Sequence, residues 1–315
     1  MRRSLFLVRR AARVRDAPTD PGPLAASAVA IGNFDAVHLG HRVVLDALFL
    51  TAASLGVPTC VYTFDPAPTA VVAPERHQAR IQTLPNRVAS LEAAGVDFVV
   101  VQPFTHEFAS LSAERFVESV LRARLGARAL VVGHDFRFGS RREGDAATLR
   151  RLAPEVQLVE VPALVMDGAA VSSSRVRKFL AVGDVEAAAA LLGRTPLISG
   201  IVTHGDGRGR TIGFPTANVK MEEELRPGAG VYAVLCVLDD GRRVAGVANL
   251  GTRPTVNGVG DSVEVHLFDF AEDLYGRRLD VGLVARLRDE RRFASLAELT
   301  AQIRIDAAAA RERLG

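Results

Sequence analysis

The stretch Ile31-Gly-Asn-Phe-Asp-Ala-Val-His-Leu-Gly-His41 is the one around which the chain is organised. An apolar run at residues 28–31 leads into it, and an Ala- and Leu-rich segment at residues 43–53 follows it. This order predicts a buried strand, a tight glycine turn and a helix. A turn of that kind directs backbone N–H groups and the positive end of a helix at one place, which favours phosphate binding.

Two histidines close this stretch. His38 and His41 are three residues apart, so they share a face if the first turn is helical. Imidazoles at a phosphate site can stabilise charge that develops during phosphoryl or nucleotidyl transfer. Gly40 lets a phosphate or a base approach the backbone closely. Two other interpretations stay open at this point: a zinc site that includes Asp35, and a purely structural pair.

The composition is that of a soluble globular chain. Its 315 residues are enough for two domains, with 48% hydrophobic and 24% charged residues. No apolar run reaches the roughly 18 residues of a membrane helix, and no basic stripe with stacking aromatics marks a nucleic-acid surface. Cys60 and Cys236 fall in predicted strands, which indicates a reducing compartment, the cytoplasm. We therefore expect neither membrane nor nucleic acid as a partner.

The first half alternates short apolar runs with helical patterns. Helices are predicted at residues 86–94 and, capped by Ser112, at residues 112–125. Alternating strands and helices predict a parallel sheet with helices on both faces and ligands at the carboxyl ends of the strands. That rule singles out the loops 32–41, 65–68 and 133–139. The predicted strands are residues 28–31, 59–64, 98–101 and 129–132, with a short edge strand at 5–8.

A serine- and arginine-rich element opens a later helix. Residues 171–177 are Val-Ser-Ser-Ser-Arg-Val-Arg, and three hydroxyls with two guanidiniums at a helix start suit a triphosphate. A serine cap on an arginine-bearing surface helix gives the same pattern. A short helix at residues 184–194 follows, and we place the boundary between two domains there, as 1–185 and 186–315.

The second half has a different period. Strands are predicted at residues 197–202, 231–238, 244–248, 263–268 and 279–284. Asp240-Gly241 is a hairpin turn, and the one helix predicted in this half spans residues 295–313. Consecutive strands with a terminal helix predict an antiparallel barrel or sandwich.

Two patterns of this half carry chemistry. The glycine-rich loop 205–213 fits neither a Walker loop nor a dinucleotide fingerprint, and a flexible turn would explain it alone. In the next residues, Thr216 and Asn218 point the same way in an extended chain, and their oxygens suit Mg²⁺ carried by nucleotide phosphates. In residues 263–268, Glu264, His266 and Phe268 share one face. A carboxylate there can accept the proton of an attacking hydroxyl, although a solvated polar face is the alternative.

These motifs resemble two known families. Gly-Asn-Phe-Asp with His-Leu-Gly-His is similar to the signature of the nucleotidylyltransferase superfamily and of bacterial FAD synthetases, which also carry a Ser-Ser-Thr-Arg-Ile-Arg element like residues 172–177. Residues 209–218, with Pro-Thr-Ala-Asn, closely resemble the riboflavin kinase module, as do residues 248–255, 264–270, 273–276, 288–293 and 302–306. The chain thus resembles the bacterial bifunctional riboflavin kinase/FAD synthetases over nearly its whole length.

The resemblance implies a fold and two reactions. The fold is an α/β nucleotidylyltransferase domain with a Rossmann-like parallel sheet, followed by an antiparallel β-barrel riboflavin kinase domain with a terminal helix. Riboflavin and ATP, with Mg²⁺, would give FMN, and FMN and ATP would give FAD and pyrophosphate. Partners would be riboflavin, FMN, FAD and ATP, and a weak homo-oligomer stays open.

The resemblance also implies site residues. In the kinase half Glu264 would take the ribityl hydroxyl proton, while Thr216 and Asn218 hold the metal; ATP and flavin would contact Gly207, Gly209, Arg210, Gly213, Pro215, Thr216, Asn218, Asn249 and Arg288. In the other half the catalytic residues would be His38, His41 and Arg175. The nucleotide would be framed by Gly32, Asn33, Phe34, Asp35 and Gly40, and pyrophosphate held by Ser173, Ser174, Arg175 and Arg177.

Two positions depart from the family pattern. Ala36 stands where the family usually has Gly, and a methyl group disfavours a positive φ. Ala67 stands where it often has His, which removes a phosphate donor. Both lie in the adenylylating half. The alternatives are therefore a riboflavin kinase with a weakened or altered adenylylating half, and a non-catalytic flavin-binding regulatory protein.

Overall fold

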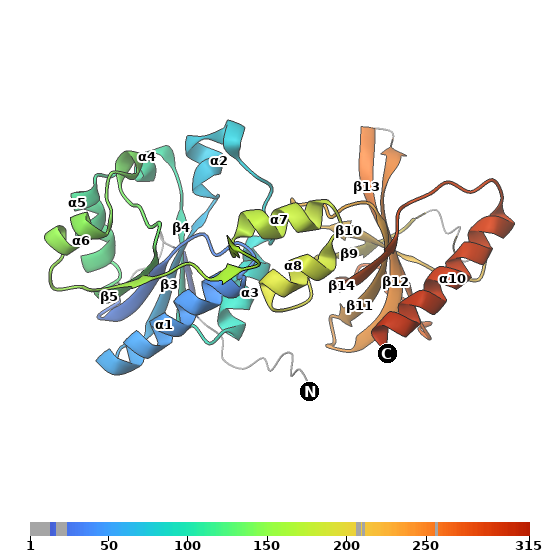
Figure 1. Cartoon of the computed structure of the whole chain (residues 1–315), viewed down its shortest axis with the longest axis horizontal. Coiled ribbons are helices and arrows are strands. Elements are labelled where there is room, and N and C mark those ends of the chain that lie inside the picture. Colours follow the sequence, from blue (N-terminus) through green and yellow to red (C-terminus); the bar gives the residue numbers. More distant parts are fainter. Residues whose placement is uncertain (1–12, 17–23, 206–208, 210–211, 256–257) are drawn as a thin grey trace. The chain divides into compact units, whose positions relative to one another are not determined.

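The computed structural model describes residues 13–16, 24–205, 209, 212–255 and 258–315 (Figure 1). The chain divides into two compact units, Met1–Val171 and Ser172–Gly315. This division comes before the boundary expected at 185/186, so the helix Ser173–Ala181, which lies between the two positions, belongs to the second unit. Each unit is described by itself. The expected edge strand at residues 5–8 lies outside the described residues.

The first unit is built on a six-stranded sheet in the order β1-β4-β3-β2-β5-β6. Every registered strand pair in it is parallel, as predicted. The sequence did not predict β6, whose pattern mixes exposed and partly buried residues. The strands are β1 (Arg13–Asp16), β2 (Ser27–Ile31), β3 (Thr59–Asp65), β4 (Phe98–Pro103), β5 (Ala127–Gly133) and β6 (Gln157–Val161).

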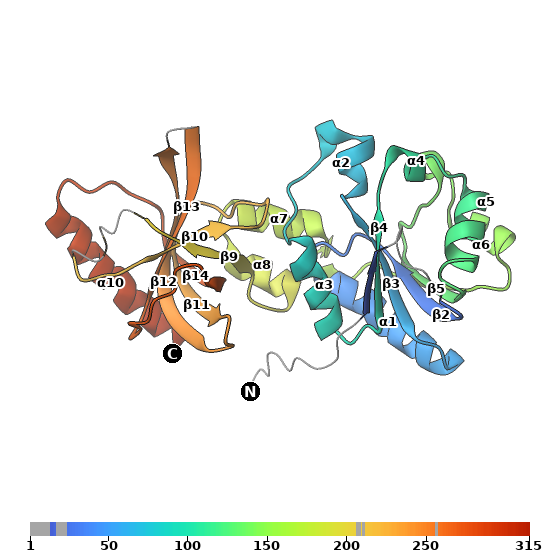
Figure 2. The same cartoon turned by 180° about the vertical axis from the view of Figure 1, so that it is seen from behind.

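Helices cover both faces of this sheet (Figures 1 and 2). On one face α1 (Leu39–Leu55) and α3 (Leu84–Ala93) bury Leu45, Leu48 and Leu91. On the other face, α5 (Ala113–Phe116) continues as a π-helical turn, Val117–Arg122, and packs beside α6 (Ala146–Leu152). Ser112 caps α5, as predicted, by accepting from the Arg115 N–H. The smaller elements are α2 (Pro68–Val72), η1 (Pro74–Arg76), α4 (His106–Ala109), η3 (Ser140–Arg142) and the pair β7 (Val165–Met166) and β8 (Ala169–Ala170).

The second unit is a closed antiparallel barrel in the order β10-β13-β12-β11-β14-β9. The structure thus decides between the barrel and the sandwich that the strand pattern left open. It also adds β10 (Ala217–Met221), which was not predicted as a strand. The other strands are β9 (Leu197–Thr203), β11 (Gly230–Leu238), β12 (Arg243–Thr255), β13 (Gly258–Leu267) and β14 (Arg278–Arg288).

Three helices with defined bounds lie in the described part of the barrel unit. In α7 (Ser173–Ala181), the Leu180 carbonyl accepts from the Gly228 N–H at 2.9 Å, which ties this helix to the segment before β11. The short helix α8 (Val185–Leu192), expected at residues 184–194, is capped by Asp184. The terminal helix α10 (Leu296–Leu314) packs Ala310 against Val231 and Phe268.

Candidate active sites

The turn between β2 and α1 has a strained backbone. Phe34, Ala36 and Val37 have φ angles of 49°, 74° and 42°, in the left-handed region. Because α1 begins at Leu39, Ala36 lies in the turn and not in the first helical position. A left-handed backbone costs a non-glycine residue roughly 1–2 kcal/mol. All three side chains are buried, so the surrounding core maintains this conformation.

Two charged side chains, Asp35 within the turn and Arg87 outside it, connect this turn to other parts of the unit. Asp35 is buried, and its carboxylate accepts from the N–H groups of Ile81 and Gln82 at 3.1 Å. Arg87 is 2% exposed and donates at 2.9 Å to the carbonyl of Asn33. Burial lowers the pKa of Arg87, which the charge of Asp35 opposes. Asp35 therefore fixes the neighbouring loop, which argues against it as a zinc ligand.

The two histidines lie face to face. His38 caps α1, because its Nδ1 accepts from the His41 N–H at 3.2 Å. The neutral His38 ring therefore carries its proton on Nε2. The two rings stack with centroids 3.7 Å apart and planes 14° apart. A Cβ atom on Gly40 would lie 3.0 Å from the Val171 carbonyl oxygen and 3.1 Å from the His38 ring, so a larger residue would press on both.

A cavity of about 340 Å³ lies at the carboxyl ends of the parallel strands. The strand ends and loops expected to carry a ligand meet in it, because Gly32, Asn33, Pro68 and Gly133 all line it. Its walls are aromatic, with six of the fifteen phenylalanines of the chain: Phe64, Phe104, Phe108, Phe116, Phe136 and Phe138. The sequence did not predict this cluster, since its members come from separate elements. Such walls suit a flat aromatic ligand.

The serine- and arginine-rich element forms the first turns of α7. Ser172 is the N-cap and accepts from the Arg175 N–H at 3.3 Å. Ser173, Ser174, Arg175 and Arg177 follow within the helix, in the second unit.

Glu264 lies between two asparagines in the barrel. In the strand register, Asn218 of β10 pairs with Glu264 of β13, and Asn249 of β12 pairs with it from the other side. Directly opposite residues have Cβ atoms about 5 Å apart. Val263 and Val265 are buried, which confirms the predicted alternation of this strand. Phe268 is also buried, because α10 covers that end of the polar face.

A cavity of about 300 Å³ opens at this place. Five predicted kinase residues line it: Gly209, Thr216, Asn249, Glu264 and Arg288. The apolar side chains Phe214, Phe293, Leu299 and Ile303 line it as well.

Asp306 of α10 holds Arg288 at the edge of this cavity. The Asp306 carboxylate accepts from Arg288 Nε at 3.0 Å and from Nη2 at 2.7 Å. Asp306 is 5% exposed and also accepts from Gln302 at 2.8 Å. The sequence placed Asp306 in a matching segment without assigning it a role, because its partner lies on another element.

A second cavity of the barrel, of about 550 Å³, shares Thr216 with the first. Pro215 also lines the second cavity, and its carbonyl lies 2.8 Å from Nδ1 of His266. Tyr275 lines it too, and its ring stacks on His204 with centroids 3.8 Å apart. Thr216 therefore stands where the two cavities adjoin.

The glycine-rich loop is partly described. The Phe214 N–H donates to the Gly209 carbonyl at 2.8 Å, and a Cβ atom on Gly209 would collide with the carbonyl of Phe214. Gly213 has a φ of 82°. Both positions require glycine. The predicted site residues Gly207 and Arg210 lie outside the described residues.

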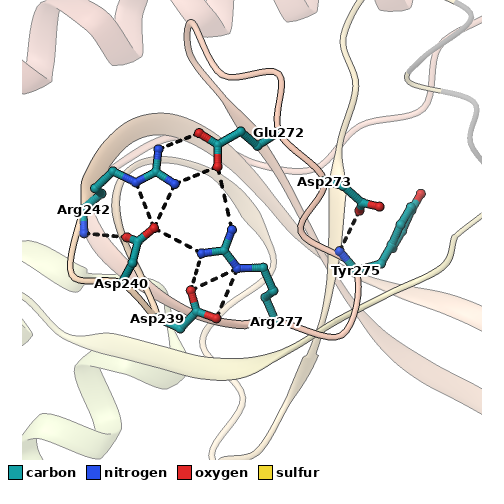
Figure 3. A network of polar contacts seen from close by, with 7 residues as sticks. All are labelled: Asp239, Asp240, Arg242, Glu272, Asp273, Tyr275 and Arg277. Atoms are coloured by element: carbon teal, nitrogen blue, oxygen red, sulfur yellow. Dashed lines mark hydrogen bonds and ion pairs between the residues drawn. The ribbon is translucent and has the colours of Figure 1, made fainter.

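A network of charges holds the loop that lines the second cavity (Figure 3). Arg242 binds Glu272 through two contacts of 2.6 and 2.7 Å, and Arg277 binds Asp239 and Asp240. The hydrogen bonds from Arg242 hold the pKa of Asp240 at about 2. Glu272 lines the cavity, while Asp240 lies in the β11–β12 hairpin turn, so the network ties that turn to the cavity wall.

No group of three or more His, Cys, Asp or Glu side chains in the described part of the chain is arranged to hold a metal ion. Thr216 and Asn218 offer a hydroxyl and an amide oxygen, which are ligands that Mg²⁺ accepts. These residues fit a cation whose other ligands come from the nucleotide.

Comparison with known proteins covers nearly the whole chain. The family described as FAD synthetase matches residues 22–175, and the family described as riboflavin kinase matches residues 192–314. A bifunctional riboflavin kinase/FMN adenylyltransferase of Escherichia coli K12 is 42% identical over 295 residues, which cover 93% of this chain and 94% of the relative. The protein of the same name from Pseudomonas fluorescens is 45% identical over 284 residues, covering 89% and 91%.

A solved structure has the same fold over nearly its full length. The crystal structure of a protein from Streptococcus pneumoniae, named a macrolide-efflux protein, matches with a TM-score of 0.88 and 30% identity, covering 95% of this chain and 98% of that one. In the described part of this chain, no helix is both long and apolar enough to cross a membrane.

Proposed function

The chain belongs to the bifunctional riboflavin kinase/FMN adenylyltransferase family, and we propose that each of its two units carries out one of the two reactions. It phosphorylates riboflavin to FMN with ATP, and it transfers the adenylyl group of ATP to FMN to give FAD. We assign the first reaction to the barrel and the second to the parallel-sheet unit, in agreement with the residues that each family matches.

Glu264 is the general base of the kinase reaction in this proposal. The observation that carries it is the register that sets Glu264 between Asn218 and Asn249 on the wall of a cavity shared with Thr216. Glu264 removes the proton of the terminal ribityl hydroxyl, whose oxygen attacks the γ-phosphorus of ATP while ADP leaves. Asn218 and Thr216 hold the nucleotide phosphates. Mg²⁺ bound there with ATP would neutralise charge on the transferred phosphoryl group.

We assign each of the two barrel cavities to one substrate of the kinase reaction. The 300 Å³ cavity has apolar walls with Phe214 and Phe293, which suit the flavin ring. The 550 Å³ cavity is open to the stacked pair His204–Tyr275 and suits the nucleotide. Thr216 adjoins both, which is where the phosphoryl group must pass from one substrate to the other.

In the first unit, the aromatic cavity of 340 Å³ holds the flavin of FMN. The FMN phosphate oxygen is already anionic, so its attack on the α-phosphorus needs no general base, and the rate comes from positioning and charge stabilisation. His38, whose Nε2 carries the proton because Nδ1 accepts from the His41 N–H, contacts the phosphates together with His41. Pyrophosphate binding by Ser173, Ser174, Arg175 and Arg177 stays a prediction.

The two cysteines bear on the cellular compartment that we propose, the cytoplasm. Cys60 and Cys236 are free and buried, and burial raises the pKa of the Cys236 thiol, which keeps it protonated and unreactive. Free buried thiols suit the reducing cytoplasm.

One incubation tests the assignment of one reaction to each unit. The protein is mixed with riboflavin, ATP and Mg²⁺, and FMN and FAD are separated by chromatography. Phe136→Ala should raise the KM for FMN in FAD formation and leave FMN formation unchanged. If no FAD forms from supplied FMN while the kinase works, the adenylylating assignment is wrong and riboflavin kinase alone remains.

A further inference from the structure

Two adjacent arginines beside the aromatic cavity have a strained backbone. Arg141 and Arg142 have φ angles of 52° and 61°. Neither is glycine, so each occupies a left-handed conformation that its side chain disfavours. Strain of this kind persists where the surrounding structure enforces it, and it is concentrated at functional sites. The sequence motif Gly-His-Asp-Phe-Arg-Phe-Gly ends just before this pair.

The loop that carries the pair is fixed on both sides. Phe138 and Gly144 exchange two backbone hydrogen bonds of 3.0 and 2.8 Å. The Ser140 N–H donates to the Leu111 carbonyl at 2.7 Å. A Cβ atom on Gly139 would lie 2.9 Å from the backbone nitrogen of Ala113, so the loop runs directly against α5. These contacts impose the left-handed turn.

Arg142 differs from its neighbours in what it faces. It lines the 340 Å³ cavity, as Arg137 does, whereas Arg141 does not. Arg137 already donates to Asp145 at 3.0 Å. Among the described residues, the Arg142 guanidinium has no ion pair and no hydrogen bond to another side chain. Its guanidinium is therefore available to bind a ligand in the cavity with aromatic walls.

We propose that Arg142 is a specificity-determining residue of the adenylylating half, whose guanidinium donates paired hydrogen bonds to oxygen atoms of the flavin substrate. This rests on the proposed binding of FMN in the aromatic cavity. A flavin enclosed by phenylalanines loses water from its oxygen acceptors, on the phosphate or on the pyrimidine edge of the ring, and such acceptors need donors. The planar fork of arginine fits a pair of oxygens, which explains an arginine at a position where glycine would be unstrained.

Matched glycine variants separate binding from strain. Arg141→Gly and Arg142→Gly each remove one positive charge and relieve a left-handed residue, so each should raise the Tm of the first unit by about 2–4 °C. Only Arg142→Gly should raise the KM for FMN in FAD formation, by about 10- to 100-fold. Arg142→Lys keeps the positive charge but loses the planar guanidinium. Its KM for FMN should lie between that of Arg142→Gly and that of the wild type. The thermal transition of the first unit itself reports that each variant is folded, and the kinase activity of the same protein reports that the barrel is unaffected.

Competition with lumiflavin shows whether Arg142 binds the oxygens of the flavin ring or those of the phosphate. Lumiflavin, which has the ring but no ribityl phosphate, inhibits FAD formation as a competitor of FMN. Its inhibition constant should rise in Arg142→Gly if the arginine binds the ring edge, and stay constant if it binds the phosphate. The proposal is overturned if Arg142→Gly leaves the KM for FMN unchanged, or if Arg141→Gly raises it equally. If Phe136→Ala also has no effect on that KM, the flavin assignment of the cavity fails first.

Discussion

At the scale of single residues, Ala36 shows how one methyl group decides between two interpretations. An alanine at this position is harmless if it begins the helix, and it is strained if the turn requires a positive φ. The structure gives a φ of 74° at a fully buried site, with the helix starting three residues later. The strained interpretation is therefore the one that applies. Beside this strained residue, His38 caps α1 and stacks on His41, and Asn33 is held by Arg87.

Ala36→Gly should stabilise the first unit by about 1 kcal/mol, because glycine adopts the left-handed conformation at no steric cost. FAD formation from FMN should be retained or faster. The control is Ala53→Gly, an exposed position near the end of α1, where the same change should destabilise by about 0.5–1 kcal/mol. Chemical unfolding measures both. A loss of stability in Ala36→Gly would contradict the assignment of strain.

Glu264→Gln should abolish FMN formation and spare the adenylylation of supplied FMN. Loss of a general base lowers kcat by about 10²- to 10⁴-fold, and glutamine keeps the size of the side chain between its two asparagine neighbours. Glu290→Gln makes the same chemical change on the wall of the same cavity and should have a small effect. Equal loss of both activities in Glu264→Gln would indicate a folding defect and remove Glu264 as the base.

At the scale of elements, ion pairs fix loops and helices that the strand pattern leaves undefined. Ion pairs among Arg242, Glu272 and Arg277 join the hairpin turn after β11 to the loop after β13. The two segments are distant in sequence, since Arg242 and Glu272 are 30 residues apart. Asp306 joins α10 to the end of β14 in the same way. Single exposed pairs contribute little to stability, so the importance of the network lies in holding the cavity wall.

Arg277→Met should raise the KM for ATP in FMN formation several-fold with kcat unchanged, because the loop carrying Glu272 and Tyr275 loses its tie to the hairpin. Steady-state kinetics measure this split. Arg122→Met, which removes an exposed arginine paired with two carboxylates in the other unit, should leave that KM unchanged. A fall in kcat with no change in KM would contradict the positioning role.

The same network sets a pH dependence. The hydrogen bonds from Arg277 lower the pKa of Asp239, and Arg277 also contributes to the lowered pKa values of Asp240 and Glu272. These carboxylates therefore favour the folded state above the unfolded pKa of about 4. That contribution is lost as the pH falls from about 4 toward 2. The difference in unfolding free energy between wild type and Arg277→Met should therefore be largest near neutral pH and shrink below pH 4. A difference that grows in acid would refute this.

At the scale of the whole molecule, the division into two units predicts independent folding. Residues 172–315 include α7 and α8, whose Leu180 and Val185 are buried and whose backbone bonds to Gly228. A fragment of residues 172–315 should fold and make FMN from riboflavin. A fragment starting at residue 186 lacks α7 and should have a lower Tm. If the shorter fragment is equally stable, the domain boundary at 185/186, which the sequence predicted, is the correct one.

Sequence patterns determined what depends on near neighbours in the chain. Apolar runs and their period predicted four strands of the parallel sheet and most of the barrel strands, because burial on one side imposes a local repeat. The Ser112 cap was predicted as well. The short strands β1, β6 and β10 were missed, since none of them shows a clear apolar repeat of its own. The motifs likewise located the turn at residues 32–41 and the face of Glu264.

Tertiary structure alone decided the rest. The buried Arg87 holds the carbonyl of Asn33, 54 residues away, and Asp35 holds the amide of Ile81. Six phenylalanines from separate elements meet in one cavity, and the free Arg142 faces it. The sign of φ at Ala36 also depends on this packing. Such contacts join residues far apart in the chain, and a periodic pattern records only whether each residue is buried, not which residue it meets.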